Sequence, residues 1–500
     1  MTATDPPKLY AAREPVFPKR ISGRFRNLKW VVMIVTLGIY YLTPWIRWDR
    51  GPNLPDQAVL VDLANRRFFF FWIEIWPHEF YFVAGLLIMA GLGLFLFTSA
   101  LGRVWCGYSC PQTVWTDLFF AVERWIEGDR NARLRLRKAN WDLKKIRLRI
   151  TKWAIWLAIA VATGGAWVFY FADAPTLLRD LVTLQVPSVA YTTIAILTAT
   201  TFVFGGFMRE QVCIYMCPWP RIQAAMMDED TITVAYRDWR GEPRGRGKRR
   251  REIAERAMAD SQAAGARDGV RQLAEPAHDN LGDCIDCHAC VNVCPVGIDI
   301  RDGQQLECIT CALCIDACDE IMDKIGKPRG LIDYLALTDE DAERSGAPPK
   351  SIIRHILRPR TLVYTALWSM IGIGLTVLLF IRTPLDVTVA PVRNPQFVTL
   401  SDGSIRNAYD LRIRNMTGED AVFHVSLRSD EILRIELEGQ TDLTVPVPAD
   451  VTQLQRVYVI ARPDDPAADA ERTGLRFWVE DQAAELRTFQ DSSFSGKGTQ

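Results

Sequence analysis

Uninterrupted apolar blocks, rather than the helical or strand periods of a soluble enzyme, dominate the hydrophobic pattern of this chain. A bilayer core of ~30 Å requires ~20 apolar residues in a helix, and a charge at its centre is costly. Five segments meet this requirement and contain no Asp, Glu, Lys or Arg: 30–46, 80–100, 153–171, 187–208 and 361–381. The pattern therefore predicts a polytopic membrane protein with five transmembrane helices.

A further apolar run, at 68–73, is too short to span a bilayer. Arg66 and Arg67 precede it, and Glu74 interrupts the apolar stretch that continues beyond it. We expect an interfacial strand or hairpin here rather than a sixth helix.

The distribution of Lys and Arg in the short loops predicts the orientation, because cytoplasmic loops carry an excess of these residues. The N-terminal segment holds five of them between Lys19 and Lys29, and the loop 130–152 is densely basic. The loop 172–186 contains only Arg179. We therefore expect the N-terminus and the segments 101–152 and 209–360 in the cytoplasm. Residues after 381 then lie outside it, in the periplasm of a Gram-negative bacterium.

Charge and cysteine content exclude two other classes of protein. The 59 basic residues balance 59 acidic ones, which argues against a nucleic-acid binder. The basic run 240–251 follows a span on the positive side and leads into a predicted charged helix at 252–273, so we interpret it as a membrane-flanking segment. All 12 cysteines fall between Cys106 and Cys318, unlike the cysteines of a secreted disulfide scaffold.

Eight of these cysteines form two copies of the motif C-x₂-C-x₂-C-x₃-C, 24 residues apart. This is the spacing of bacterial two-cluster ferredoxins, in which the fourth cysteine of each motif binds the other cluster. Structural zinc, the alternative, favours C-x₂-C pairs that are well separated in sequence. Asp319 stands where a second proline would follow the motif. We expect two [4Fe–4S] clusters that relay single electrons, one held by Cys284, Cys287, Cys290 and Cys318 and the other by Cys308, Cys311, Cys314 and Cys294.

The other four cysteines also form a repeat, with the pattern C-x-Y-x-C-P at 106–111 and again at 213–218. Each copy follows a predicted two-span hairpin and a basic residue, Arg103 or Arg209, so the hairpins resemble a parallel repeat. If each copy is helical, its two cysteines share a face. A twofold arrangement would then gather Cys106, Cys110, Cys213 and Cys217 near the cytoplasmic membrane surface.

This duplication favours a redox or metal role for the four membrane cysteines over simple packing. Soft thiolates select Cu(I), zinc or iron–sulfur centres, and a dithiol that cycles to a disulfide is a further alternative.

After residue 386 the chain changes to short alternating stretches separated by turn residues. About seven or eight strands in ~115 residues predict an immunoglobulin-like β-sandwich. It has no cysteine pair and no visible catalytic constellation, so we interpret it as a structural or partner-binding domain.

Together these features resemble the CcoG family of cytochrome c oxidase accessory proteins, also called FixG or RdxA. The resemblance covers nearly the whole chain and rests on the two C-x-Y-x-C-P repeats, the stretch 284–326 and the stretch 393–415. It implies a multi-pass protein of the bacterial inner membrane that aids assembly of cbb3-type oxidase through copper redox handling. It also implies relatives among the NapH-type membrane ferredoxins, which are thought to take electrons from quinol.

The predicted fold is thus a multi-domain membrane protein with five transmembrane α-helices, an α+β two-cluster ferredoxin-like module and a C-terminal immunoglobulin-like β-sandwich. The expected segments are a cytoplasmic N-terminus (1–29), a four-helix membrane domain with both repeats (30–236), a charged linker (237–278), the ferredoxin module (279–330), a cytoplasmic linker (331–360), the fifth helix (361–381) and the periplasmic sandwich (382–500).

The leading functional hypothesis is an oxidoreductase of cupric reductase type. It would pass electrons from a cytoplasmic or quinol donor through the clusters to the four membrane cysteines, where Cu(II) becomes Cu(I). Its partners would be oxidase subunits or copper-delivery factors. One alternative is a quinol-oxidising protein without copper, and another is a non-enzymatic assembly scaffold with structural clusters.

Overall fold

The computed structural model describes residues 15–51, 54–245, 282–481 and 483–498. The chain divides into two compact units, Met1–Ile46 with Ala58–Ile373 and Arg47–Gln57 with Gly374–Gln500. Much of the expected charged linker, including the predicted helix 252–273, lies outside the described residues.

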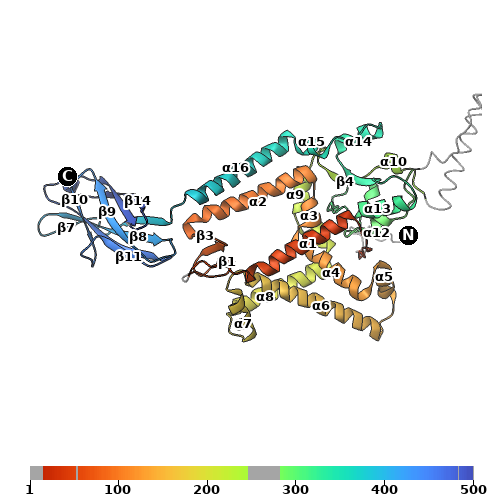
Figure 1. Ribbon diagram of the computed structural model, residues 1–500, viewed down its shortest axis with the longest axis horizontal. Helices are drawn as coiled ribbons and strands as arrows, with labels where there is room; N and C mark the ends of the chain where they lie inside the picture. The colour runs from red at the N-terminus through yellow and green to blue at the C-terminus, as the bar shows by residue number, and fades with distance from the viewer. Residues whose placement is uncertain (1–14, 52–53, 246–281, 482, 499–500) are drawn as a thin grey trace, which may run out of the picture. The chain divides into compact units, whose positions relative to one another are not determined.

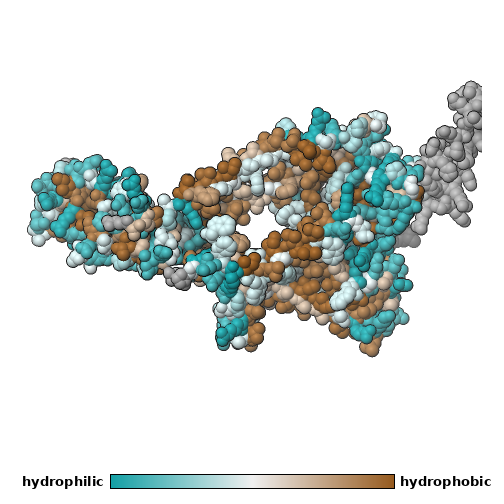
Figure 2. Space-filling view, in the orientation of Figure 1, coloured by the Kyte–Doolittle hydropathy of each residue, from teal (hydrophilic) through white to brown (hydrophobic). Residues whose placement is uncertain are grey.

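Among the residues that the structure describes, five helices are long and apolar enough to cross a membrane, by length and composition. They are α1 (Arg24–Leu42), α2 (Phe80–Leu101), α6 (Leu143–Val168), α8 (Ser188–Val203) with its π-helical extension η3 (Phe204–Met208), and α16 (Pro359–Ile381). Few of their side chains are buried, and Figure 2 shows hydrophobic residues along their outer surfaces. Such helices need an apolar environment outside the protein, which suggests association with a membrane.

Two of these helices start earlier than the apolar blocks. The first begins at Arg24 and the third at Leu143, so each carries basic residues in its first turns. Arg and Lys are good helix formers, and their long side chains reach partners at the end of a span. Arg26, for example, pairs with buried Asp117 at 2.8 Å.

The apolar run at 68–73 belongs to a small antiparallel sheet. Its strands are β1 (Val59–Asp62), β2 (Arg67–Phe70) and β3 (Ile73–Ile75), in the order β1-β2-β3. The expected hairpin is therefore present, with Arg67 and Glu74 paired across it at 3.2 Å.

The ferredoxin module is larger than the expected 279–330. Its helices α12 (Ala289–Val293) and α13 (Leu313–Lys324) pack with a two-stranded sheet of β4 (Thr233–Tyr236) and β5 (Ile332–Leu335), which register Thr233 opposite Leu335. The segment 331–360, expected as a linker, is structured: after β5 it forms α14 (Leu337–Arg344) and α15 (Ile352–Ile356). Asp316 of α13 accepts hydrogen bonds from the backbone N–H groups of Phe25 and Arg26 and so caps α1.

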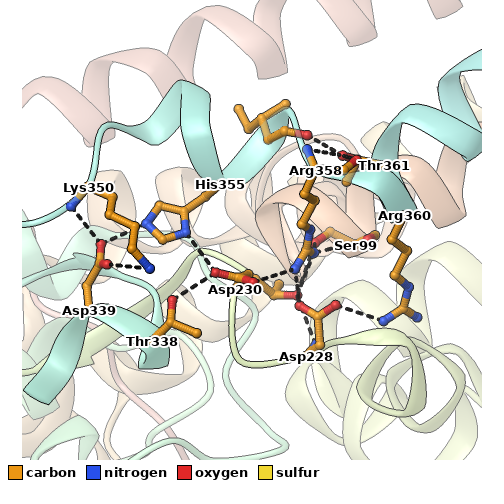
Figure 3. A network of polar contacts seen from close by, with 12 residues as sticks. Ser99, Asp228, Asp230, Thr338, Asp339, Lys350, His355, Arg358, Arg360 and Thr361 are labelled. Carbon is orange, nitrogen blue, oxygen red and sulfur yellow. Dashed lines mark hydrogen bonds and ion pairs between the residues drawn. The ribbon is translucent and has the colours of Figure 1, made fainter.

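A polar network holds the segment before α16 in place (Figure 3). The His355 ring contacts Asp230 through Nδ1 (3.2 Å) and Asp339 through Nε2 (2.7 Å). Arg358 donates to Asp228 and to the carbonyl of Ser99 at the end of α2. Farther along, Trp368 of α16 donates a hydrogen bond to the carbonyl of Met89 in α2. The two helices α2 and α16 lie side by side there (Figure 1).

The second unit contains a two-sheet sandwich. One sheet has the order β10-β12-β8-β6 with β7 on β8, and the other has the order β11-β9-β13-β14. The strands are β6 (Leu385–Pro391), β7 (Val398–Thr399), β8 (Ile405–Asn415), β9 (Ala421–Ser429), β10 (Leu433–Leu437), β11 (Thr444–Val447), β12 (Thr452–Ala461), β13 (Thr473–Asp481) and β14 (Leu486–Phe494). Alternate residues of β8 are buried, as in an immunoglobulin-like core.

The remaining short helices are α3 (Val104–Tyr108), α4 (Pro111–Glu127), α5 (Arg130–Lys138), α7 (Ala174–Val182), the π-helical turn η4 (Val212–Met216), α9 (Trp219–Met226), α10 (Asp238–Gly241) and α17 (Pro466–Asp469), with 3₁₀ turns η1 (Thr43–Trp45), η2 (Pro77–Glu79) and η6 (Ile300–Asp302).

Candidate functional site

The two ferredoxin motifs share one backbone shape. Asp286 and His288, on either side of the second cysteine of the first motif, have φ of 51° and 55°. Thr310 and Ala312, 24 residues later, have φ of 54° and 59°. L-residues rarely adopt positive φ, so its recurrence at equivalent places shows that the repeat in sequence is also a repeat in structure. Each loop therefore curls in the same way around its first three cysteines.

Cys294 lies beside the cysteines of the second motif. It lines a cavity together with Cys308, Cys311 and Cys314, and Cys290 of the first motif also reaches this cavity. Burial, together with the neighbouring Cys311 and Cys308, raises the pKa of the Cys294 thiol to about 12. This is the neighbourhood that ligand crossing requires.

Cys318 lies near the cysteines of the first motif, as the predicted reciprocal crossing requires. Burial raises the pKa of Cys318 to about 12, with Cys290, Cys284 and Cys287 contributing in the same direction. We refer to Cys284, Cys287, Cys290 and Cys318 as the first thiol set and to Cys294, Cys308, Cys311 and Cys314 as the second thiol set.

The residues present fit [4Fe–4S] clusters. The cavity at the second thiol set is lined by soft thiols between apolar walls, which is the donor set of such a cluster. Among residues 15–51, 54–245, 282–481 and 483–498, no three His, Cys, Asp or Glu side chains lie close enough to hold a single metal ion. A thiolate that burial disfavours is stabilised by the iron it binds.

Asp319, which replaces the second proline, has a structural contact. Its carboxylate accepts a hydrogen bond from the N–H of Gly330 at 3.0 Å, which ties α13 to the turn before β5.

The four membrane cysteines do not lie on continuous helices. Cys106 is in α3 and Cys213 in the π-helical turn η4, but Cys110 and Cys217 are extended residues with ψ of 129° and 125°. The expectation that each pair shares one helical face is therefore wrong. A proline follows each second cysteine and disfavours the helical conformation at the residue before it, so each pair spans a helix break.

The two repeats nevertheless bring their thiols into one neighbourhood. Burial, together with the neighbouring Cys110, Cys106 and Cys217, raises the pKa of Cys213 to about 12. Cys106 donates from Sγ to Oε1 of Gln223, at 3.1 Å. We call these four cysteines the membrane thiol site. Within the described part of the chain they do not form a preformed site for one ion.

The membrane thiol site is in direct contact with the second thiol set. Gly107, next to Cys106, packs so closely that an added Cβ would lie 2.5 Å from the Ile309 carbonyl oxygen and 3.0 Å from the Cys311 Cα. The Tyr108 hydroxyl donates to the Cys311 carbonyl at 3.1 Å. The backbone next to Cys106 therefore touches the backbone of the second cysteine loop.

Sequence reasoning missed Gln223 and Thr113. Gln223 is 1% exposed and also donates to Thr98, while Thr113 donates to the Cys106 carbonyl at 2.6 Å. Isolated Gln and Thr residues give no signal in a single sequence, so only the fold identifies these partners of Cys106.

Comparisons with known proteins agree with this architecture. Family models match residues 208–336 (4Fe-4S dicluster domain), 82–132 (4Fe-4S binding domain) and 375–497 (Ig-like fold at the C-terminus of FixG). The chain is 67% identical to protein RdxB of Cereibacter sphaeroides over 99% of both chains, and 61% identical to its protein RdxA over 95% of both. It is 53% identical to the nitrogen fixation protein FixG of Rhizobium meliloti, covering 98% of this chain and 94% of that one.

Among solved structures, a FixG-related protein from Vibrio parahaemolyticus matches 23% of this chain and 99% of its own, with 20% identity and a TM-score of 0.20.

Proposed function

Because the chain belongs to the FixG/RdxA family of iron–sulfur proteins, we propose that its electron-transfer role is to deliver single electrons to the membrane thiol site and there reduce Cu(II) to Cu(I). The observation that carries this proposal is the contact of Gly107 and Tyr108 with Ile309 and Cys311. It leaves no intervening layer between the second thiol set and Cys106.

The residues divide into two roles. The two thiol sets hold the clusters, which supply one-electron carriers when bound. The membrane thiol site receives copper as substrate, because thiolates prefer Cu(I) to Cu(II) and stabilise the reduced ion. Each Cu(II) takes up one electron, so a two-electron donor such as a quinol would reduce two copper ions.

The same proposal includes location and partners. The protein is a multi-pass protein of the bacterial inner membrane, with the N-terminus and ferredoxin module in the cytoplasm and the sandwich in the periplasm. The basic residues at the ends of α1 and α6 support this orientation. Cu(I) would pass to oxidase subunits or copper-delivery factors during assembly of cbb3-type oxidase.

Replacing Cys213 and Cys217 together by Ser tests the proposal, because serine oxygen holds Cu(I) poorly. We expect this variant to keep the iron of both clusters and to lose copper binding and Cu(I) formation. The measurements are copper and iron per protein and the rate of Cu(I) formation under anaerobic conditions. Met216→Leu is the matched control, since it removes an exposed neighbouring sulfur without removing a thiol. A double variant that retains copper and reductase activity would place copper chemistry elsewhere.

Quinol oxidation without copper is the second candidate, and the lack of a preformed single-ion site in the described residues favours it. Cluster reduction by quinol in copper-free protein, with no Cu(II) reduction on addition of copper, would select it.

A further inference from the structure

Arg103 is a buried cation between the membrane thiol site and the second thiol set. It is 3% exposed and sits at the N-terminus of α3, the helix that carries Cys106. Its guanidinium donates to the carbonyl of Leu306, two residues before Cys308. Its Nε atom is buried without a hydrogen-bond partner.

No carboxylate lies within ion-pair distance of Arg103 among the residues that the structure describes. The basic residue that precedes the second repeat lies one position farther from its first cysteine and has a carboxylate partner: Arg209 pairs with Glu123 at 2.6 Å. A buried charge without a counterion is costly, so it is retained where something else compensates it. Four thiolates already give a bound [4Fe–4S] centre a net negative charge, and an added electron would strengthen its attraction to Arg103.

The first thiol set has a different charge environment. Its nearby arginine, Arg301, is bound by both Asp286 and Asp299 at 2.6 Å, so two carboxylates outnumber it. Arg244, close to this group, is shared by Glu242 and Asp302 at 3.6 Å each.

We propose that the uncompensated charge of Arg103 makes the centre at the second thiol set the more easily reduced of the two, and so directs electrons toward Cys106. A fixed positive charge stabilises the reduced, more negative state of a neighbouring cluster, and carboxylates destabilise it. One electron moves at a time, so the centre at the first set is oxidised as the centre at the second set is reduced. Arg103 is therefore a positioning residue for charge, and its side chain also contacts the Cys106 thiol of the membrane thiol site.

This inference rests on the proposed function for its direction, but its test needs no copper. The full-length protein with both clusters is titrated with dithionite and followed by low-temperature electron paramagnetic resonance. We expect two one-electron waves in the wild type. Arg103→Gln should lower the reduction potential of the more easily reduced centre by ~59 mV, which corresponds to about a tenfold change for one electron. The lower of the two potentials should stay in place. Arg103→Lys keeps the charge and should largely restore the wild-type value.

Arg301→Gln is the matched variant, since it removes the arginine of the other set. It should move only the lower wave, and to still lower potential, because Asp286 and Asp299 remain. Iron content confirms that both clusters are present in each variant. If Arg103→Gln loses iron, the Arg301→Gln variant still tests the inference. A shift of the higher reduction potential in Arg301→Gln would overturn the assignment of that potential to the second thiol set.

The inference also fails if Arg103→Gln moves the lower wave, both waves equally or neither. If the reduction potentials shift as expected but the protein cannot reduce Cu(II), only the copper proposal is overturned. Unchanged potentials in a protein that does reduce Cu(II) would overturn only the role of Arg103.

Discussion

Gly107→Ala is the most direct perturbation of the contact between the two redox sites. The added Cβ would lie 2.5 Å from the Ile309 carbonyl oxygen, 3.0 Å from the Cys311 Cα and 3.1 Å from the Cys311 nitrogen. All three are backbone atoms of the second cysteine loop, so no side chain can rotate away. The loop and α3 must separate, while the cysteine ligands themselves are unchanged.

Overpacking of this kind costs about 1–3 kcal/mol, or roughly a 5- to 150-fold shift toward the separated arrangement at ~1.4 kcal/mol per tenfold. We expect slower electron delivery with normal iron content. Anaerobic protein is reduced with dithionite, freed of excess reductant and mixed with Cu(II) and a Cu(I) chelator in a stopped-flow instrument. Cluster reoxidation and Cu(I) formation are followed together.

Gly165→Ala in α6 is the control, because its added Cβ would meet nothing within 4 Å. It should behave as wild type. Hydrogen exchange over residues 306–311 reports the contact independently and should increase only in Gly107→Ala. Wild-type kinetics and unchanged exchange in Gly107→Ala would refute the view that this contact is the route of electrons.

Two further predictions concern ligand crossing and orientation. Cys294→Ser should damage the cluster of Cys308, Cys311 and Cys314 and leave the other largely intact, as iron content and low-temperature spectra of the reduced variant would show; loss confined to the first set would contradict the crossing. Reporter fusions should place residues 140 and 300 in the cytoplasm and residue 450 outside it. If residues 300 and 450 lie on the same side of the membrane, the chain has one span fewer than predicted.

The parts of the fold that depend on local pattern could be predicted from the sequence. Apolar length is sufficient for the five helices, and the repeated cysteine spacing is sufficient for the pair of cluster loops. The alternation of apolar and polar residues is sufficient to predict the sandwich, although the structure contains more strands than expected. In each case the controlling interaction lies within the segment itself or its repeat.

Contacts between distant segments could not be predicted in this way. Thr233 pairs with Leu335 across the whole ferredoxin module, so the true limits of that module depend on a strand pairing without a local signal. The packing of Gly107 on Cys311 likewise joins residues that no pattern relates. The helix break at Cys110 is a different case, because Pro111 signals it and the helical interpretation gave that residue too little weight.

The two C-x-Y-x-C-P repeats are alike in sequence but unequal in their surroundings. The first has Gly107 between its cysteine and tyrosine, and Tyr108 is 6% exposed against the ferredoxin module. The second has Ile214 at that place, and Tyr215 is 75% exposed. Because any side chain at position 107 would strike backbone atoms, only the copy with glycine has this close contact with the second cysteine loop. Duplication therefore supplies matching thiols, while one glycine and one unpaired arginine in the first copy make it the side that electrons enter in our proposal.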